Sequence, residues 1–312
     1  MQTDTPGPST GHRERYPCTN EPILTPVSVT QSSSLCQDCF FEFHIEERVT
    51  PTYVGRSEWS GCPFRGLTRG EPCPRYVPRH QLQNDLAEFL GTSVEQVLAR
   101  RKDIVDSKLQ EAAWRAKARD TEQDILDYYE NEDCYLYMYS AGLGTRSELL
   151  APLIRFTGGR GKVLDYGCGV AAEAYWLARS GAYQVSLADL DSPHFRFAQW
   201  RFRRYGLPEG FYVLPKDRVR LFRGRFDAII CLEVIEHVTH WRQMLDDFVS
   251  SLEPGGWLLM TVGKPTPDNT LHINRLTGLT EEAYRDHLTR CGMELAHTDS
   301  PQAEFWVWRK PP

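Results

Sequence analysis

Residues 163–169 read Val-Leu-Asp-Tyr-Gly-Cys-Gly, a short apolar run that leads into a glycine turn. Small residues follow from Ala172 to Arg179 in a pattern typical of a helix. Gly167 and Gly169 permit a tight turn and a close approach of a ligand to the backbone, and the start of the helix offers free amide groups. The stretch therefore predicts the strand, turn and helix of a nucleotide-binding α/β sheet.

Strand and helix patterns alternate from this stretch to residue 312. Because buried apolar strands that alternate with helices are typical of doubly wound sheets, we expect an α/β fold with a mainly parallel sheet. The amphipathic helix that begins near Trp241 should be closed by Pro254-Gly255-Gly256. The predicted strands are 162–165, 184–188, 211–214, 226–232, 257–262, 293–297 and 305–309.

Three segments precede the predicted sheet domain, which we place at 151–312. Residues 1–35 are rich in Pro, Ser and Thr and predict a disordered or loosely packed tail. Residues 36–80 combine cysteines with many Pro, Gly and Arg residues and predict an irregular segment. Residues 81–150 carry helical periodicity and predict a helical cap, with a capping box formed by Thr92 and Glu95.

The cysteines are nine in number, and their uneven distribution does not fit a secreted disulfide framework. Cys36, Cys39, Cys62 and Cys73 lie together in the irregular segment. Four thiols can hold a tetrahedral zinc ion and organise a segment that is too rich in Pro and Gly to fold by core burial. We expect a structural zinc site there, with incidental cysteines as the alternative.

Composition limits the classes of function. The net charge is −6 and 41% of the residues are hydrophobic, which argues against a general binder of nucleic acid or membrane surfaces. No apolar run approaches the roughly 18–20 residues that span a bilayer, and the start of the chain lacks the pattern of a secretory signal. We expect a cytoplasmic protein. Arginines at 196–204 and 218–225 leave a local RNA-binding strip open as an alternative to exposed faces of a helix and a loop.

Two carboxylates indicate the kind of cofactor. Asp189 ends the second predicted strand, 24 residues after Asp165, where a carboxylate can accept both ribose hydroxyl protons. Asp165 stands just before the glycines, where it would repel a phosphate and suit a cationic ligand. These charges favour S-adenosylmethionine over a dinucleotide.

The segments Val163–Ala172, Val185–Asp191, Phe226–Val238 and Leu252–Val262 together resemble the successive motifs of class I S-adenosylmethionine-dependent methyltransferases. The resemblance covers about residues 155–312. It implies a seven-stranded Rossmann-like sheet whose last strand inserts antiparallel. Ala171 departs from the pattern, because many members carry a third glycine there.

The same resemblance implies a set of cofactor contacts. Asp165, Gly167 and Gly169 would line the methionine moiety, and Asp189 would bind the ribose. Asp217 follows the third strand and would contact the adenine, although the stretch around it lacks a clear Gly-Asp pair. The complete expected cofactor set is Asp165, Gly167, Cys168, Gly169, Asp189, Leu190, Asp217 and Glu233.

The stretch Glu233-Val234-Ile235-Glu236-His237 follows the fourth predicted strand. If the chain turns helically there, its two carboxylates and its imidazole share one face. The stretch resembles ubiquinone-pathway O-methyltransferases and small-RNA 2′-O-methyltransferases that carry a later histidine. That resemblance implies that Glu233, Glu236, His237 and His272 bind Mg²⁺ or Mn²⁺. In one alternative these residues only bond the loop backbone, and in another His237 is a metal-free general base.

From these features we expect an enzyme that transfers a methyl group from S-adenosylmethionine to an oxygen of a small molecule, with His237 and Glu236 as catalytic residues. An RNA 2′-O-methyltransferase and a catalytically degenerate binding protein with this fold are the alternatives. No motif names the acceptor or the oligomeric state.

Overall fold

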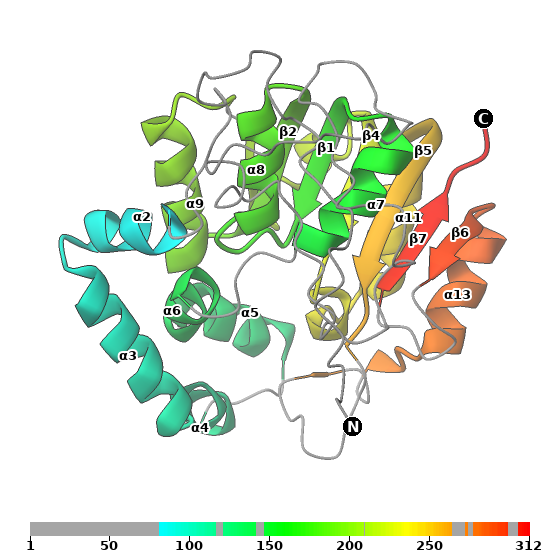
Figure 1. Ribbon diagram of the computed structural model, residues 1–312. Helices are drawn as coiled ribbons and strands as arrows, with labels where there is room; N and C mark the ends of the chain where they lie inside the picture. Colours follow the sequence, from blue (N-terminus) through cyan, green and yellow to red (C-terminus); the bar gives the residue numbers. More distant parts are fainter. Residues whose placement is uncertain are drawn as a thin grey trace, which may run out of the picture.

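A sheet of seven strands forms the centre of the chain in the computed structural model (Figure 1). The structure describes residues 81–116, 121–141, 147–208, 210–263, 272–273, 277–298 and 305–312. The predicted tail and the cysteines of the predicted zinc site therefore lie outside the described residues. No helix within the described ranges is long and apolar enough to cross a membrane.

The strands run in the order β3-β2-β1-β4-β5-β7-β6. The first five pair in parallel, and β7 inserts antiparallel between β5 and β6. This arrangement confirms the expected Rossmann-like methyltransferase sheet. The strands are β1 (Gly161–Tyr166), β2 (Tyr183–Leu190), β3 (Phe211–Leu214), β4 (Phe226–Cys231), β5 (Leu252–Thr261), β6 (Glu294–Thr298) and β7 (Phe305–Arg309).

Helices cover both faces of the sheet, so strand residues are buried on both sides. Val163 and Leu164 are neighbours in β1, yet each is fully buried in a different apolar core. Successive side chains of a strand point to opposite faces, which explains why the central strands are apolar throughout rather than alternating. The helices of the domain are α7 (Ser147–Thr157), α8 (Ala172–Ser180), α9 (Pro193–Arg204), α10 (Arg218–Leu221), α11 (Trp241–Ser251) and α13 (Glu281–Arg290).

The predicted cap consists of short helices, of which α2 and α6 lie beside α9, while α3 and α4 extend away from it (Figure 1). Its apolar core is continuous with the sheet domain, because Leu86 and Val97 pack in one cluster with Val170 and Phe197. The cap is therefore anchored on the glycine turn and on α9. The cap helices are α2 (Gln81–Leu90), α3 (Val94–Asp106), α4 (Leu109–Ala116), α5 (Glu122–Asn131) and α6 (Cys134–Ala141).

A buried ion pair also joins the cap to the domain. The Arg201 Nε of α9 donates to Asp85 Oδ2 of α2 at 2.9 Å, and both side chains are almost fully buried. Tyr205 donates its hydroxyl to the other Asp85 oxygen at 2.6 Å. Arg201 Nη1 also donates to the carbonyl of Val170 at 3.3 Å, so one guanidinium connects the cap with the glycine turn.

Some local expectations differ from the structure. The capping box is made by Ser93 and Gln96 rather than Thr92 and Glu95, one residue later than expected. The reason is that Gly91 and Thr92 still complete the end of α2, with the Thr92 amide bonded to the carbonyl of Ala87. The Pro254-Gly255-Gly256 stretch lies within β5 and does not close α11, because α11 already ends at Ser251. Helices α7 and α10 were not predicted.

Candidate active site

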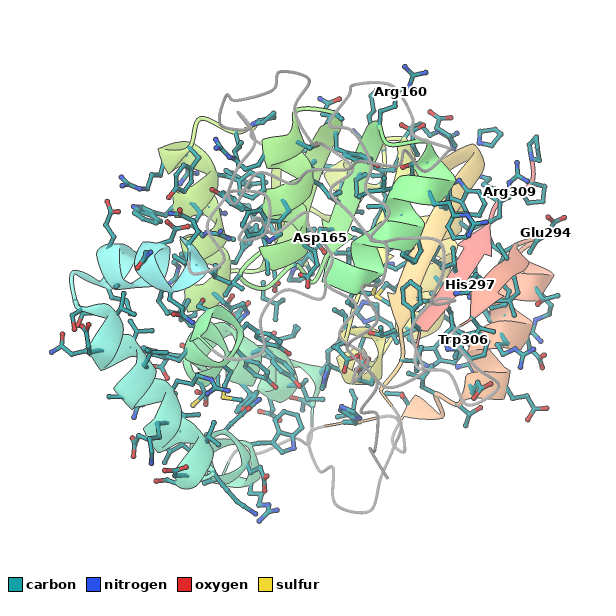
Figure 2. The ribbon with its side chains drawn as sticks, in the orientation of Figure 1. Arg160, Asp165, Glu294, His297, Trp306 and Arg309 are labelled. Carbon is teal, nitrogen blue, oxygen red and sulfur yellow. The ribbon has the colours of Figure 1, made fainter. Side chains whose placement is uncertain are left out.

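A cavity of about 360 Å³ lies between the ends of β1, β2 and β4 and the cap helices. Figure 2 places Asp165 at the centre of the fold, whereas Glu294, His297 and Trp306 lie on the β6–β7 side of the sheet. The cavity is bounded by the predicted glycine turn on one side and by the predicted Glu-x-x-Glu-His stretch on the other. This position agrees with the rule that ligands of doubly wound sheets bind at the carboxyl ends of the strands.

The turn needs glycine at its two positions for different physical reasons. Both have positive φ, +69° at Gly167 and +53° at Gly169. A Cβ on Gly167 would lie 2.3 Å from Cγ2 of Val234, so this glycine lets the loop after β4 pack on the turn. A Cβ on Gly169 would meet nothing within 4 Å. The backbone of Gly169 therefore lines open space that a ligand can fill.

Three carboxylates are concentrated beside this turn. Asp165 and Asp189 are buried, and Glu173 also lines the cavity from the first turn of α8. Burial raises the pKa of Asp165 well above its usual value, and the nearby charges of Glu173 and Asp189 raise it further. Burial also raises the pKa of Asp189, while His194 and two backbone amides oppose that shift. A cationic ligand would offset this repulsion and favour the ionised form of these carboxyl groups.

Most of the predicted cofactor residues line the cavity. The carboxylate of Asp189 accepts from the amides of Gly169, at 2.6 Å, and Leu190, at 2.7 Å, which fixes it at the strand end. Asp217 does not line the cavity; it accepts from the Val213 amide at 2.9 Å and holds the turn after β3. The predicted residues on the cavity wall are Asp165, Gly167, Cys168, Gly169, Asp189, Leu190 and Glu233.

Several residues that no sequence pattern predicts line the cavity near the expected adenine side. Leu214, Pro215 and Arg218 line the cavity where Asp217 does not. Arg218 donates through Nε to Asp247 at 2.7 Å, so a helix on the other side of the loop holds it in place. His194 is also buried on the wall, and its burial lowers its pKa. No motif marks these residues, since they follow a strand or begin a helix without a distinctive spacing.

At the other end of the cavity, the chain forms a short 3-10 helix at Ile235–His237. This helical turn is the condition under which side chains of the Glu-x-x-Glu-His stretch can share one face. The candidate ligand atoms of Glu236, His237 and His272 all lie within 4.8 Å of one another. His272 Nε2 is 4.0 Å from Glu236 Oε1, and the amide of Ile273 donates to the carbonyl of Glu236 at 2.9 Å. The structure thus brings together His237 and His272, which are 35 positions apart in the chain.

Gly263 makes this close approach possible. A Cβ at this position would lie 2.4 Å from His272 Cε1 and 2.6 Å from Glu236 Oε1. Any side chain would therefore force the histidine or the carboxylate to move. Gly263 follows β5 without a recognisable motif, and only the folded chain shows that it belongs to the site.

Glu233 stands apart from these three residues. Its backbone has a positive φ of 56°, and its amide donates to Thr261 Oγ1 at 2.6 Å. It lines the cavity but does not belong to the group of potential ligands that Glu236, His237 and His272 form. Of the four expected metal ligands, the structure therefore groups three: Glu236, His237 and His272.

The cap contributes side chains to the same end. The hydroxyl of Tyr129 in α5 is 2.7 Å from Nδ1 of His237. Glu122, at the start of the same helix, is 2.8 Å from Nδ1 of His240. Tyr135 and Tyr139 stack on each other with ring centroids 5.8 Å apart, and both line the cavity. The cap thus forms one wall of the site. The sequence did not predict that Tyr129 and Glu122 would line it.

A second group of potential ligands lies between α11 and α13, outside the cavity. Oδ1 of Asp246 is 2.8 Å from Nε2 of His287 and accepts from the thiol of Cys291 at 3.4 Å. These contacts already satisfy the carboxylate oxygen and join the two helices. This group therefore serves as a structural link between α11 and α13.

Comparison with known proteins gives a family match over about half of the chain. Residues 143–296 match the family described as "Methyltransferase domain". A ubiquinone biosynthesis O-methyltransferase from Chromobacterium violaceum is 34% identical over 101 residues, which are 32% of this chain and 43% of that protein. One from Xanthomonas euvesicatoria is 31% identical over 123 residues, 39% of this chain and 50% of that protein. The chain thus spans about half the length of the curated relatives it matches.

Solved structures with a similar arrangement are more distant. A magnesium protoporphyrin IX methyltransferase from Synechocystis with bound SAM is 18% identical, with a TM-score of 0.44 over 62% of this chain and 98% of that chain. An O-methyltransferase family protein from Burkholderia thailandensis is 13% identical, with a TM-score of 0.46 over 66% of this chain and 70% of that chain.

Proposed function

Because residues 143–296 match the methyltransferase domain family, we propose that this chain transfers a methyl group from S-adenosylmethionine to an oxygen of a small molecule. The observation that carries the proposal is the cavity itself. One of its ends concentrates the buried carboxylates Asp165 and Asp189 beside an open glycine backbone, and its other end is lined by His237 and His272, with the buried Glu236 next to them. A cationic cofactor and a nucleophilic acceptor can therefore meet within one cavity.

The residues at the first end fit S-adenosylmethionine. Its amino and sulfonium groups are positive, so Asp165 and Glu173 offer compensating charge, and Asp189 can accept ribose hydroxyl protons. A pyrophosphate would be repelled by the same carboxylates. When bound, this cofactor supplies an electrophilic methyl group for in-line displacement; the protein supplies alignment and excludes water.

We assign acceptor activation to the second end. Its two imidazoles and one buried carboxylate suit a borderline divalent ion such as Mn²⁺, and three protein ligands leave positions for an acceptor oxygen. Glu236, His237 and His272 would hold the ion, which would lower the pKa of an acceptor hydroxyl. Without an ion, His237 can take the hydroxyl proton as a general base. Glu233 is assigned to the cavity wall beside the cofactor.

A small acceptor is favoured over RNA. Three of the arginines that could form a basic strip are engaged by acidic neighbours: Arg196 with Asp191, Arg204 with Glu88, and Arg218 with Asp247. Arg201 is buried against Asp85 and cannot contact a phosphate backbone. The cap also encloses the cavity with tyrosines and apolar side chains. The cytoplasm is the proposed setting of the reaction, as the sequence predicts.

Cofactor binding is the direct test. Calorimetric titration of the full chain with S-adenosylmethionine should show saturable binding that Asp189→Asn weakens at least about tenfold, the cost of one charge-assisted hydrogen bond. Asp191→Asn is the matched control, because Asp191 is the exposed neighbour of the same strand end and does not line the cavity. Folded protein that binds no S-adenosylmethionine would reject the enzyme and support a degenerate binding protein.

The proposed ion has its own test. Mn²⁺ titration followed by electron paramagnetic resonance should show one site that His272→Ala removes. His287→Ala should leave that site intact, because His287 belongs to the group between α11 and α13. Loss of the site in His287→Ala and not in His272→Ala would place the ion between α11 and α13 and reject the proposed site in the cavity. No Mn²⁺ binding at all would leave His237 as the general base.

A further inference from the structure

Three side chains that can bind a metal ion meet between α11 and α13. Oδ1 of Asp246 is 2.8 Å from Nε2 of His287 and 3.4 Å from the thiol sulfur of Cys291. All three donor atoms lie within 4.8 Å of one another. The group therefore offers one oxygen, one nitrogen and one sulfur to a single point, and none of the three residues lines the cavity of the proposed active site.

The helices that carry these side chains are fixed by the apolar core. Trp241 of α11 packs in one buried cluster with Tyr284 and Leu288 of α13. His287 lies four positions before Cys291, which caps the end of α13, so the two side chains are neighbours on one side of that helix. Donors on two packed helices have set positions, and a metal site requires such a scaffold.

Packing also sets the orientation of the His287 imidazole. Its ring lies edge-on against the indole of Trp241, with 5.8 Å between the ring centroids. Trp241 is itself only 1% exposed, and its Nε1 donates to the carbonyl of Thr277 at 3.3 Å. The ring therefore presents Nε2 to Asp246 without the help of an ion.

The spacing of the donor atoms is close to that of a zinc site. Zn²⁺ lies about 2.0–2.3 Å from its nitrogen, oxygen and thiolate ligands, so tetrahedral angles put these atoms roughly 3.3–3.7 Å apart. The distance between Asp246 Oδ1 and the Cys291 sulfur is already 3.4 Å. The distance of 2.8 Å between Oδ1 and His287 Nε2 must widen by about 0.5 Å. The half-exposed side chain of Asp246 has room for that movement.

We propose that Asp246, His287 and Cys291 form a zinc site that ties α11 to α13 and leaves one coordination position to water. Imidazole and thiolate are zinc ligands, whereas Mg²⁺ and Mn²⁺ prefer oxygen. When the ion binds, the thiol proton is released to solvent and the imidazole coordinates through an unprotonated Nε2. The carboxylate and the thiolate then balance the charge of the ion. This site is separate from the four-cysteine site predicted near the start of the chain, and it does not depend on the proposed function.

Cadmium NMR can detect the site in the full chain. ¹¹³Cd²⁺ takes the place of zinc, and its chemical shift reports how many thiolates bind it. We expect a signal typical of one thiolate, separate from a four-thiolate signal of the predicted cysteine site and from a sulfur-free signal of the cavity group. Cys291→Ser should remove the one-thiolate signal. A wild-type spectrum without this signal overturns the proposal, and so does a signal that survives Cys291→Ser.

Asp246→Asn and Asp247→Asn form a matched pair at neighbouring positions of α11. Each removes one negative charge with little change in shape, but Asp247 pairs with Arg218 rather than with the proposed ligands. An ion that binds only the folded protein stabilises it. Zinc should therefore raise the melting temperature of wild type and of Asp247→Asn by the same amount, and that of Asp246→Asn by less.

Zinc bound elsewhere in the chain would raise the melting temperatures of all three proteins alike, so the difference between the two variants isolates the proposed site. An equal rise in Asp246→Asn and Asp247→Asn overturns the proposal. Competition with a chromophoric chelator gives the stoichiometry. Asp246→Asn and Cys291→Ser should each bind one zinc ion fewer than wild type, and unchanged stoichiometry in both would also overturn it.

Discussion

The cofactor end of the cavity, formed by Asp165, Gly167, Gly169 and Asp189, comes from two neighbouring strands and the turn between β1 and α8. The transfer end is lined by Tyr129, His237 and His272, and Glu236 and Gly263 pack behind it, so that four separate segments of the chain assemble it. A contiguous turn carries its chemistry in local sequence, whereas an assembled end depends on how helices and loops pack. The two ends should therefore fail in different ways when they are changed.

The strongest test asks whether the cofactor end needs the cap. Asp85→Ala would leave the Arg201 guanidinium buried and unpaired, so the free energy of unfolding should fall by about 3–5 kcal/mol. Because Arg201 also holds the Val170 carbonyl, S-adenosylmethionine binding should weaken as well. Urea unfolding and calorimetry would measure both effects.

Glu88→Ala is the control for that change, since Glu88 lies on the same helix and pairs with Arg204 in solvent at 2.7 Å. An exposed pair contributes about 0–1 kcal/mol, so this variant should be nearly unchanged. Equal losses of unfolding free energy in the two variants would mean that the buried Asp85–Arg201 pair stabilises the protein no more than an exposed pair.

A second change should break the transfer end alone. In Gly263→Val, the new side chain would occupy the space of His272 and Glu236, so Mn²⁺ affinity should fall by about 100-fold or more, near 2.7 kcal/mol. S-adenosylmethionine affinity should remain, because Gly263 does not line the cavity. Titrations with each ligand separate the two effects.

Gly210→Ala is a suitable control, because its Cβ would meet the Ser186 hydroxyl at 2.8 Å in another part of the sheet. It should cost some stability and leave Mn²⁺ binding unchanged. If Gly263→Val kept the full Mn²⁺ affinity, His272 would not be part of the site.

A third change isolates close packing at the cofactor end. Gly167→Ala and Gly181→Ala introduce the same methyl group at φ +69° and +71°. Both should lose about 1–2 kcal/mol from left-handed backbone strain. Only Gly167→Ala also meets Val234, so it should lose about 1–3 kcal/mol more and weaken S-adenosylmethionine binding. Thermal unfolding would measure the stability of both variants. Equal losses of stability would show that the Val234 side chain moves aside without cost.

The smallest expected effect concerns the pH dependence of stability. The pKa of Asp165 in the folded protein is raised by burial above the value of about 3.9 in the unfolded chain. The protonated form is therefore favoured by folding, and this stabilisation is present below the unfolded pKa and is lost as the pH rises through the folded pKa. Without ligand, Asp165→Asn should be more stable than wild type by a margin that grows with pH.

Urea unfolding at several pH values between 5 and 8 would measure this margin, with Asp191→Asn as the control for loss of one surface charge. The same Asp165→Asn protein should bind S-adenosylmethionine more weakly, since it lacks a compensating charge. A margin that shrinks as the pH rises would contradict a raised pKa for Asp165.

Most of the residues that the sequence predicts to bind the cofactor line one cavity, because the turn and the strand ends that carry them are adjacent in the sheet. The order of apolar runs, the turn after residue 165 and the carboxylate at the end of the next strand are local patterns, and the structure places them together. Asp217 shows the limit of this approach. It stands at the expected distance after β3, yet its carboxylate bonds the Val213 amide, and Leu214, Pro215 and Arg218 reach the cavity instead.

At the transfer end the sequence determined only the residue types. It indicated Glu233, Glu236, His237 and His272 as one set of ligands, whereas the structure groups only the last three. Gly263 and Tyr129 carry no local signal. Their importance comes from contacts between segments that fold back on one another, and the tertiary structure alone decides which side chain meets the imidazole of His237. The sequence by itself determined the sheet and its charged turn, because hydrophobic periodicity and glycine conformation act within short stretches of chain.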